Sequence, residues 1–249
     1  MSDALALTWR QYRLERKMFW RNPSAAFFNF VLPLLFLALF GAVFAGSQTD
    51  LNVIVPGIAG MSVMTTTFVA LAMNMVFLRE QGVLKRLRGT PLPSGAYLAG
   101  LAAHALTNTA LQLSIVIGVG ALLFGVGLPE EWFMLAVFVG AGVVAFAALG
   151  VALSHAIPNF DSAPAYVNAI FLPVIVLSGV FYDANHAPTF LRDIAQALPL
   201  THLVDGLSAA IVTGAPFADH VSDLVVILLW GTLGVVLAVR GFTWEARRG

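Results

Sequence analysis

The sequence predicts an all-α integral membrane protein with six transmembrane helices. Of its 249 residues, 59% are hydrophobic and 10% are charged, whereas soluble domains carry about 25% charged residues. A water-soluble fold could not bury this much apolar surface, because a single core stops growing with chain length. The apolar residues also form long continuous runs, unlike the short alternating segments of a membrane β-barrel.

We expect a membrane span wherever about 20 consecutive residues are mostly apolar, since that length crosses the hydrocarbon core. Six runs within a single transmembrane domain (1–249) meet this criterion, with expected bounds 25–45, 53–78, 97–124, 132–157, 165–181 and 221–239. A cleaved signal peptide is the alternative for the first run, with Val43, Phe44 and Ala45 at the cleavage site. The length of that run and the charged segment before it favour a retained span.

The lysines and arginines predict the orientation of the spans. Five precede the first span, four lie between the second and third, and three follow the sixth; Arg192 is the exception. The positive-inside rule therefore places both termini in the cytoplasm. The loop near 158–164 should also be cytoplasmic, although it contains no lysine or arginine.

The sequence lacks the residues of several functional classes. It has no cysteine, no phosphate-binding Gly-x-x-x-x-Gly-Lys loop, no Ser-His-Asp pattern and no metal-ligand motif. The spans contain no acidic or basic residue near their centres, and His104 and His155 are the only titratable candidates there. Helix packing or an interfacial position accounts for each of these two histidines. We therefore expect no catalytic residue, no metal site and no energy source within the chain.

The N-terminal segment (1–22) is predicted to be an amphipathic surface helix. Arg10, Arg13, Lys17 and Arg21 recur every three or four residues, so they form one stripe on a helix. Apolar side chains lie beside this stripe, namely Leu5, Trp9, Tyr12, Phe19 and Trp20. Such a helix binds the membrane surface, with its basic edge near anionic head groups, and it could also contact a cytoplasmic partner.

The loop between the second and third spans (79–93) contains a second short amphipathic pattern. Val83, Leu84 and Leu87 form a small apolar face among charged residues, and two prolines end the helix at 91 and 93. A basic loop that only sets membrane topology would explain the arginines but not the amphipathic pattern. The pattern therefore favours a docking segment for a cytoplasmic partner.

These motifs resemble the ABC-2 type family of ABC exporter permeases, and its drug-export branch in particular. The resemblance rests on ordered motifs over essentially the whole chain: Arg21-Asn22-Pro23, Pro33, Pro56-Gly57-Ile58, Arg79-Glu80-Gln81-Gly82 through Leu87, Thr90-Pro91-Leu92, Leu172-Pro173, Leu177-Ser178-Gly179-Val180-Phe181 and Pro199-Leu200-Thr201. One departure is Leu78, where family members often have an acidic residue before the Arg-Glu pair.

The resemblance implies roles for three segments. The N-terminal helix corresponds to the connecting helix, with site residues Trp9, Arg10, Arg13, Lys17 and Arg21. The 79–93 loop corresponds to the coupling helix that inserts into an ATP-binding subunit, with site residues Glu80, Gln81, Gly82, Leu84, Lys85, Arg86, Leu87, Arg88, Thr90 and Pro91. The segment 183–220 corresponds to short external re-entrant helices between the fifth and sixth spans.

The resemblance also implies partners and a location. Two ATP-binding subunits, carrying ATP and Mg²⁺, would drive two permeases, as a homodimer or with a related permease. The permease itself would be a non-enzymatic, multi-pass subunit in a bacterial or archaeal plasma membrane. It would contact lipid and an amphipathic or hydrophobic substrate such as a drug, an antibiotic or a lipid, and no nucleic acid.

The second and fifth spans would then line the substrate pathway. Its candidate residues are Met61, Thr65, Phe68, Met75, Asn168 and Phe171, because methionine and aromatic side chains suit varied ligands. Ordinary helix packing explains the same stripe equally well, and Asn168 could instead form an interhelical hydrogen bond. The rival functions are a proton-coupled carrier using His104 or His155, an exporter of a lipid-linked glycan, and a membrane anchor that recruits a partner.

Overall fold

The computed structural model of the chain describes residues 2–44, 46–90, 92–182 and 188–241. Several predicted features therefore lie outside the described residues: Pro91 of the docking segment, Ala45 at the end of the first expected span, the first five residues of the 183–220 segment, and Arg247 and Arg248 of the last basic cluster.

Every regular element in these ranges is a helix. The α-helices are α1 (Ser2–Trp20), α2 (Pro23–Val43), α3 (Gln48–Met64), α4 (Ala70–Glu80), α5 (Val83–Arg88), α6 (Ser94–Phe124), α7 (Trp132–Ser154), α8 (Ala163–Leu177), α9 (Thr189–Ala195), α10 (Pro199–Ser208) and α11 (Val221–Gly241). Two π-helical turns, η1 (Thr65–Val69) and η3 (Ala209–Thr213), and one 3₁₀ turn, η4 (Phe217–His220), connect or extend them.

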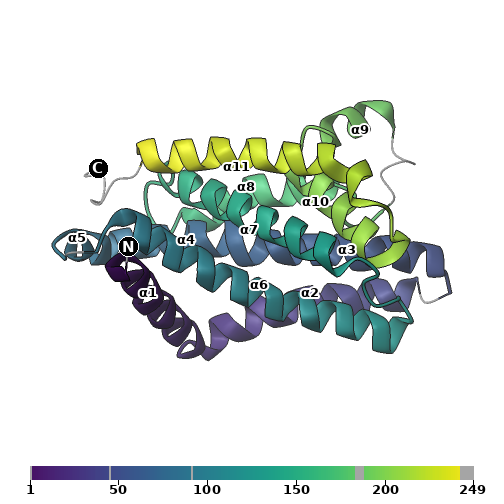
Figure 1. The fold of residues 1–249 in the computed structure, drawn as a ribbon, viewed down its shortest axis with the longest axis horizontal. Coiled ribbons are helices and arrows are strands. Elements are labelled where there is room, and N and C mark those ends of the chain that lie inside the picture. Colours follow the sequence, from purple (N-terminus) through teal and green to yellow (C-terminus); the bar gives the residue numbers. More distant parts are fainter. Residues whose placement is uncertain (1, 45, 91, 183–187, 242–249) are drawn as a thin grey trace.

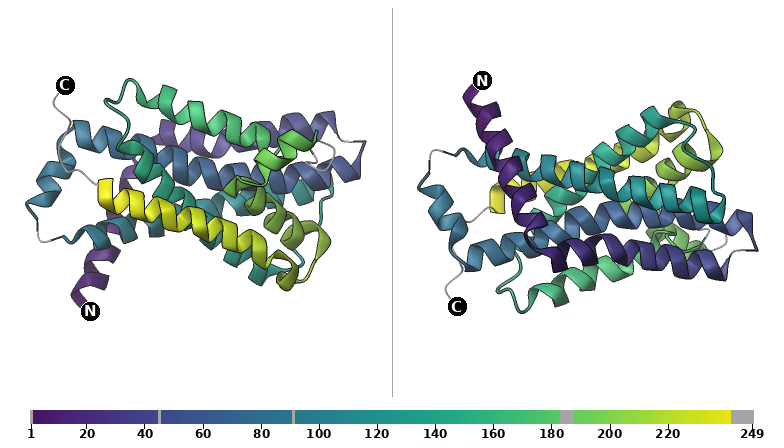
Figure 2. Two further views of the ribbon diagram at one scale, coloured as in Figure 1. Left: turned by 90° about the horizontal axis from the view of Figure 1, so that it is seen from above. Right: turned by 90° about the horizontal axis from the view of Figure 1, so that it is seen from below.

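The long helices run side by side along one axis (Figure 1). The start of α1, the helix α5 and the end of α11 lie together at one end of the bundle, which we call the α5 end. Helix α9 and the turn between α2 and α3 lie at the opposite end, the α9 end. Helix α1 crosses the bundle axis obliquely and projects from its side (Figure 2).

The continuous rod formed by α3, η1 and α4 lies at the centre of the bundle, in contact with α2, α6, α7 and α10. Two glycines allow close backbone contact with this rod. A Cβ on Gly57 would lie 2.9 Å from the Cα of Val180, and one on Gly150 would lie 2.6 Å from the carbonyl oxygen of Phe68. A side chain at either position would displace a neighbouring backbone, so close helix packing requires glycine there.

The π-helical turn η1 has a local cause in three consecutive threonines. Thr65, Thr66 and Thr67 each donate a hydroxyl hydrogen bond to the carbonyl four residues earlier, at 2.5 to 2.8 Å. These bonds compete with the backbone ladder and loosen the helix. Thr66 also shares a 2.7 Å hydrogen bond with the hydroxyl of Thr109, which ties the turn to α6. Such π turns often occur at functional sites.

Four helices of the described chain are long and apolar enough to cross a membrane: Gln48–Glu80, Gly95–Phe124, Trp132–Ser154 and Phe217–Gly241. Helices α9 and α10 form a fifth candidate if a pair bent by 90° counts as one span. The stretches Asn29–Val43 and Ala163–Leu177 are apolar but shorter. Fifteen helical residues rise about 22 Å, less than the roughly 30 Å hydrocarbon core. Six spans therefore remain a prediction.

The bent pair at the α9 end is fastened to its neighbours through backbone carbonyls. The indole nitrogen of Trp230 in α11 donates a 2.9 Å hydrogen bond to the carbonyl of Ala197, which lies between α9 and α10. The amides of Glu130 and Glu131 both donate to the carbonyl of Ala210 in η3, at 3.0 and 3.1 Å. These bonds hold the pair against α7 and α11.

Helix α1 packs on α6 through both polar and aromatic side chains, among them Gln11 and Phe19. Gln11 and Glu15 are buried there, and the Gln11 amide donates a 2.7 Å hydrogen bond to the Glu15 carboxylate. Gly100 of α6 allows this contact, since a Cβ at that position would lie 2.7 Å from the side chain of Gln11. Burial raises the pKa of Glu15 from 4.5 to about 7.

Replacing Glu15 by glutamine is expected to remove part of the pH dependence of stability. A carboxyl whose pKa is raised on folding favours the folded state at low pH, and this contribution is lost as the pH rises through about 7. At pH 8, Glu15→Gln should therefore raise the free energy of unfolding by about 1 to 3 kcal/mol. Thermal unfolding in detergent at pH 5 and pH 8 measures this, with the exposed Glu131→Gln as control. Parallel pH profiles for Glu15→Gln and the parent would refute the assignment.

Candidate functional site

The chain reverses direction at Gly82, directly after α4. Gly82 has φ 65° and ψ 14°, in the left-handed region that glycine occupies without a steric penalty. Its amide donates to the carbonyl of Arg79 at 3.1 Å, and its carbonyl accepts from the amide of Arg86 at 3.2 Å. This turn sets the direction of α5, the short helix of the predicted docking segment.

Helix α5 is anchored to the bundle by one apolar face. Leu84 is only 1% exposed and belongs to a buried cluster with Leu78 of α4 and Tyr97 and Leu101 of α6. Other apolar side chains of the segment pack against this cluster, namely Val83, Leu87 and Leu92. A displacement of α5 would therefore move side chains of α4 and α6.

The opposite face of α5 is basic and exposed. Lys85 and Arg86 are exposed, and the Arg86 guanidinium donates a 3.2 Å hydrogen bond to the carbonyl of Gln81. Thr90 closes the segment with a 2.6 Å bond from its hydroxyl to the carbonyl of Leu87. The predicted docking residues thus divide into an anchoring set and an exposed set. The side chain of Arg88 lies outside the described residues.

Arg79, the last basic residue of α4, is 7% exposed and connects α4 to α7. Its guanidinium donates to the carbonyl of Ser154, the last residue of α7, at 2.9 Å, and to that of Ile157, three residues further on, at 2.5 Å. The last carbonyls of a helix have no partners within the helix, and its C-terminus carries a partial negative charge. The buried guanidinium of Arg79 supplies hydrogen-bond donors there and a positive charge beside the C-terminus of α7.

Glu80 holds the segment that follows α7. Its carboxylate accepts a 3.0 Å hydrogen bond from the amide of Phe160, and the rings of Phe160 and Phe77 pack edge to face with centroids 5.4 Å apart. The loop near 158–164 has no basic residue of its own, and Arg79 supplies one from α4. The Arg79-Glu80 pair therefore fastens α4, and with it the start of α5, to the connection between α7 and α8.

Sequence reasoning missed this role of Arg79. It placed Arg79 in the basic cluster, in the 79–93 loop and in the family motif, but its candidate site residues began at Glu80. An arginine at the end of a long apolar helix, facing a loop that lacks basic residues, is a signal that could have suggested the contact. The partner carbonyls are 75 and 78 residues away, and no local spacing identifies them.

The basic residues of α1 are all exposed, as are the large apolar side chains of Leu5, Trp9 and Trp20. Tyr12 is buried, and its hydroxyl accepts a 2.9 Å hydrogen bond from Arg16. Its ring stacks on Trp9 with centroids 5.0 Å apart. Helix α1 thus exposes its basic side chains together with Leu5, Trp9 and Trp20, and it packs on α6 through other polar and aromatic side chains.

Three of the predicted pathway residues lie in one apolar cluster: Met61, Phe68 and Phe171, from α3, η1 and α8. Each is at most 9% exposed within a single chain. Phe68 also lines an apolar cavity of about 740 Å³ together with Ile170 and Trp230.

The other predicted pathway residues are separate from this cluster. Met75 belongs to the Leu84 cluster, where its sulfur accepts a 3.8 Å hydrogen bond from Tyr97. Thr65 is half-buried, and Asn168 is exposed on α8.

The two histidines of the rival carrier hypothesis occupy different surroundings. His104 lies in α6, where its ring packs against Phe19 with centroids 5.6 Å apart. His155 directly follows α7 and lines the same 740 Å³ cavity as Phe68. Aromatic packing against α1 explains His104 without a role in proton transfer.

Comparisons with known proteins place the chain among transport permeases. A family model described as ABC-2 type transporter matches residues 3–212. The putative transport permease YvfS of Bacillus subtilis is 24% identical over 88% of this chain and 91% of its own length. The inner membrane transport permease YadH of Escherichia coli K12 is 22% identical over 69% of each chain. Nodulation protein J of Rhizobium leguminosarum bv. trifolii is 28% identical over 70% of this chain and 67% of its own.

Proposed function

Because the chain belongs to the ABC-2 type transporter family, we propose that it is the transmembrane subunit of an ATP-driven exporter. ATP and Mg²⁺ bind a separate ATP-binding subunit, present in two copies. The observation that carries the proposal is α5: one face is anchored by Leu84, the other exposes Lys85 and Arg86, and the helix emerges from the end of the central rod. A subunit that pushes on this helix gains direct mechanical contact with the centre of the bundle.

Two sets of contacts transmit a displacement of α5 to the other helices. The buried face of α5 moves α4 and α6 through the Leu84 cluster. The Arg79-Glu80 pair moves the end of α7 and the loop that leads to α8. Packed helices switch between discrete arrangements rather than deforming continuously, so a small displacement of α5 can shift the bundle between inward-open and outward-open forms.

In this proposal the α5 end faces the cytoplasm, and α2 and α8 complete a set of six spans. The distribution of lysine and arginine supports that orientation. The exposed basic and apolar side chains of α1 support its assignment as a connecting helix at the membrane surface. Helices α9 and α10 form the external re-entrant segment.

Two permeases, identical or related, form the pathway between them. The exposed apolar side chains of α8 support an interface or pathway there, among them Tyr166, Ile170, Leu172 and Val176, with Asn168 on the same helix. The cluster of Met61, Phe68 and Phe171 lies beneath this surface and suits an amphipathic or hydrophobic substrate. A drug, an antibiotic, a lipid or a lipid-linked glycan fits this chemistry.

Reconstitution tests the proposal. The tagged permease is purified from its native membranes together with any bound ATP-binding subunit, then placed in liposomes. We expect ATP hydrolysis that requires both subunits and uptake of a fluorescent amphipathic dye into inside-out vesicles that requires ATP. Dye uptake driven by a pH gradient without ATP would instead establish a carrier. A complex that hydrolyses ATP at the rate of the free ATP-binding subunit and moves no dye would favour a recruiting anchor.

A further inference from the structure

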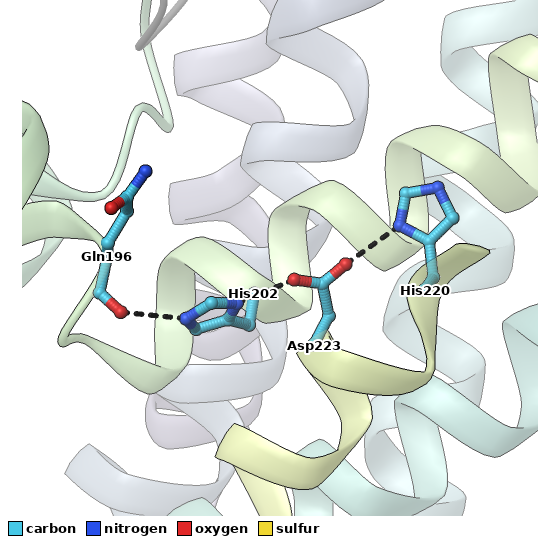
Figure 3. Close-up of polar contacts among 4 residues, drawn as sticks. All are labelled: Gln196, His202, His220 and Asp223. Carbon is cyan, nitrogen blue, oxygen red and sulfur yellow. Dashed lines mark hydrogen bonds and ion pairs between the residues drawn. The ribbon is translucent and has the colours of Figure 1, made fainter.

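Three potential metal ligands meet at the α9 end, between α10 and α11 (Figure 3 shows two of them, with their neighbours). His202 and Asp205 are three residues apart and therefore share one face of α10. Asp223 lies in the first turn of α11. One ligand atom from each of the three side chains lies within 4.8 Å of the others. The coupling proposed for α5 does not involve these three residues.

The contacts of His202 require a proton or a metal ion between its ring and the carboxylate of Asp223. Its Nε2 lies 2.8 Å from the carbonyl oxygen of Gln196, which can only accept, so Nε2 carries a proton. Its Nδ1 lies 2.6 Å from a carboxylate oxygen of Asp223. A neutral ring would then direct a lone pair at a negatively charged oxygen. The contact is favourable only if a proton or a metal ion lies between the two atoms.

Neighbouring groups hydrogen-bond His202 and Asp223 in the way that groups around a bound metal ion hold its ligands. Metal-binding histidines usually donate their other ring N–H to a carbonyl or carboxylate, as His202 does to Gln196. Ligating carboxylates are themselves hydrogen-bonded, and the second oxygen of Asp223 lies 2.8 Å from Nδ1 of His220. Gln196 and His220 therefore already hold the side chains of His202 and Asp223 in position (Figure 3).

The cluster borders a cavity of about 520 Å³, which Asp205, His220 and Asp223 line. Ser178 and Thr201 also line it, and their buried hydroxyls have no hydrogen-bond partner among the described residues. These hydroxyls provide further polar groups near a bound ion and its water. Arg192 lines the same cavity and is the opposing positive charge. Once the His202 proton is displaced, the two carboxylates outweigh Arg192, so the site then favours a bound cation.

We propose that His202, Asp205 and Asp223 bind one divalent transition-metal ion of the zinc class. Imidazole and carboxylate are ligands of Zn²⁺, with ligand distances of about 2.0 to 2.2 Å, and a three-ligand site leaves one position for water. The ion replaces the proton between His202 and Asp223, and the two atoms move apart to accommodate it. Bound in this way, it joins α10 to α11 and fastens the bent α9–α10 pair to the bundle.

No short motif marks this site. His202 and Asp205 form only an i, i+3 pair, and Asp223 follows 18 residues later, at the start of the last helix. The sequence therefore predicted no metal ligands, and the packing of α10 against α11 brings the three together.

The test measures zinc binding to the full-length permease in detergent. The protein carries an affinity tag without histidine, is treated with EDTA and is dialysed against Zn²⁺ at pH 7.5. We expect one zinc per chain and a higher unfolding temperature with zinc. Mg²⁺ at the same concentration should not raise it, because Mg²⁺ prefers an octahedral shell of oxygen ligands. Asp223→Asn, His202→Gln and Asp205→Asn should each weaken zinc binding at least tenfold.

Asp50→Asn is the matched control, because it removes one exposed carboxylate at the α9 end outside the cluster. Its zinc binding should equal that of the parent. Asp205 is exposed, so Asp205→Asn decides the question if the other two variants fail to fold. The proposal is overturned if the parent binds no stoichiometric zinc, in which case a proton alone bridges His202 and Asp223. It is equally overturned if Asp205→Asn binds zinc as the parent does.

Discussion

Replacing Gly82 by valine is expected to lower the ATPase activity of the reconstituted complex at least tenfold, to the level of the free ATP-binding subunit. Gly82 has φ 65°, and the left-handed region costs an L-residue about 1 to 2 kcal/mol, more for a β-branched side chain. Apart from the adjacent residues, no heavy atom of the described chain lies within 4 Å of a Cβ at this position, so the effect is one of backbone conformation. The strained turn would redirect α5 away from its partner.

Gly82→Asn provides the control for this prediction. Asparagine tolerates the left-handed region far better than valine and adds a side chain of similar size. The asparagine variant should retain most of the stimulated ATPase activity, while both variants should appear in the membrane in equal amounts. Full activity of Gly82→Val would show that the direction of α5 does not matter for coupling.

Replacing Arg79 by methionine is expected to destabilise the α5 end by about 2 to 4 kcal/mol, since hydrogen bonds to charged groups contribute roughly 1.5 to 3 kcal/mol each. Methionine fills similar space but leaves the carbonyls of Ser154 and Ile157 without this donor. The loop before α8 would loosen as well. Thermal unfolding in detergent measures the loss, and amide hydrogen exchange should increase at the end of α7.

Arg86→Met is the matched control for Arg79→Met. Arg86 is exposed on α5 and makes one 3.2 Å hydrogen bond to a backbone carbonyl of its own segment. Its replacement should change stability by less than about 0.5 kcal/mol, as expected for surface positions. Equal unfolding temperatures for the two variants would rule out a structural role for the buried guanidinium.

Hydropathy and charge alone predicted the all-helical membrane class, because long apolar runs have few other stable arrangements. The short helix after Gly82 was also predictable, since an amphipathic pattern between a glycine and two prolines has local causes. The family was predictable from its ordered motifs, and the match over residues 3–212 confirms it.

The features that the sequence did not reveal depend on contacts between distant segments. The amphipathic pattern of the N-terminal segment does not single out Gln11 and Glu15, whereas the packing of α1 on α6 buries both. The π turn at Thr65–Val69 follows from three threonine back-bonds that hydropathy ignores. His202 and Asp223 meet only because α10 and α11 pack together.

The central claim is that α5 is the contact surface for an ATP-binding subunit. The chain has no cysteine, so a single cysteine reports one position without background. Lys85→Cys on the exposed face of α5 should form a crosslink to the ATP-binding subunit through a short thiol-reactive photocrosslinker, more strongly with one nucleotide state than another. Leu122→Cys, exposed at the far end of α6, should give none. Equal crosslinking from both positions, or none from Lys85→Cys in an active complex, would contradict the account.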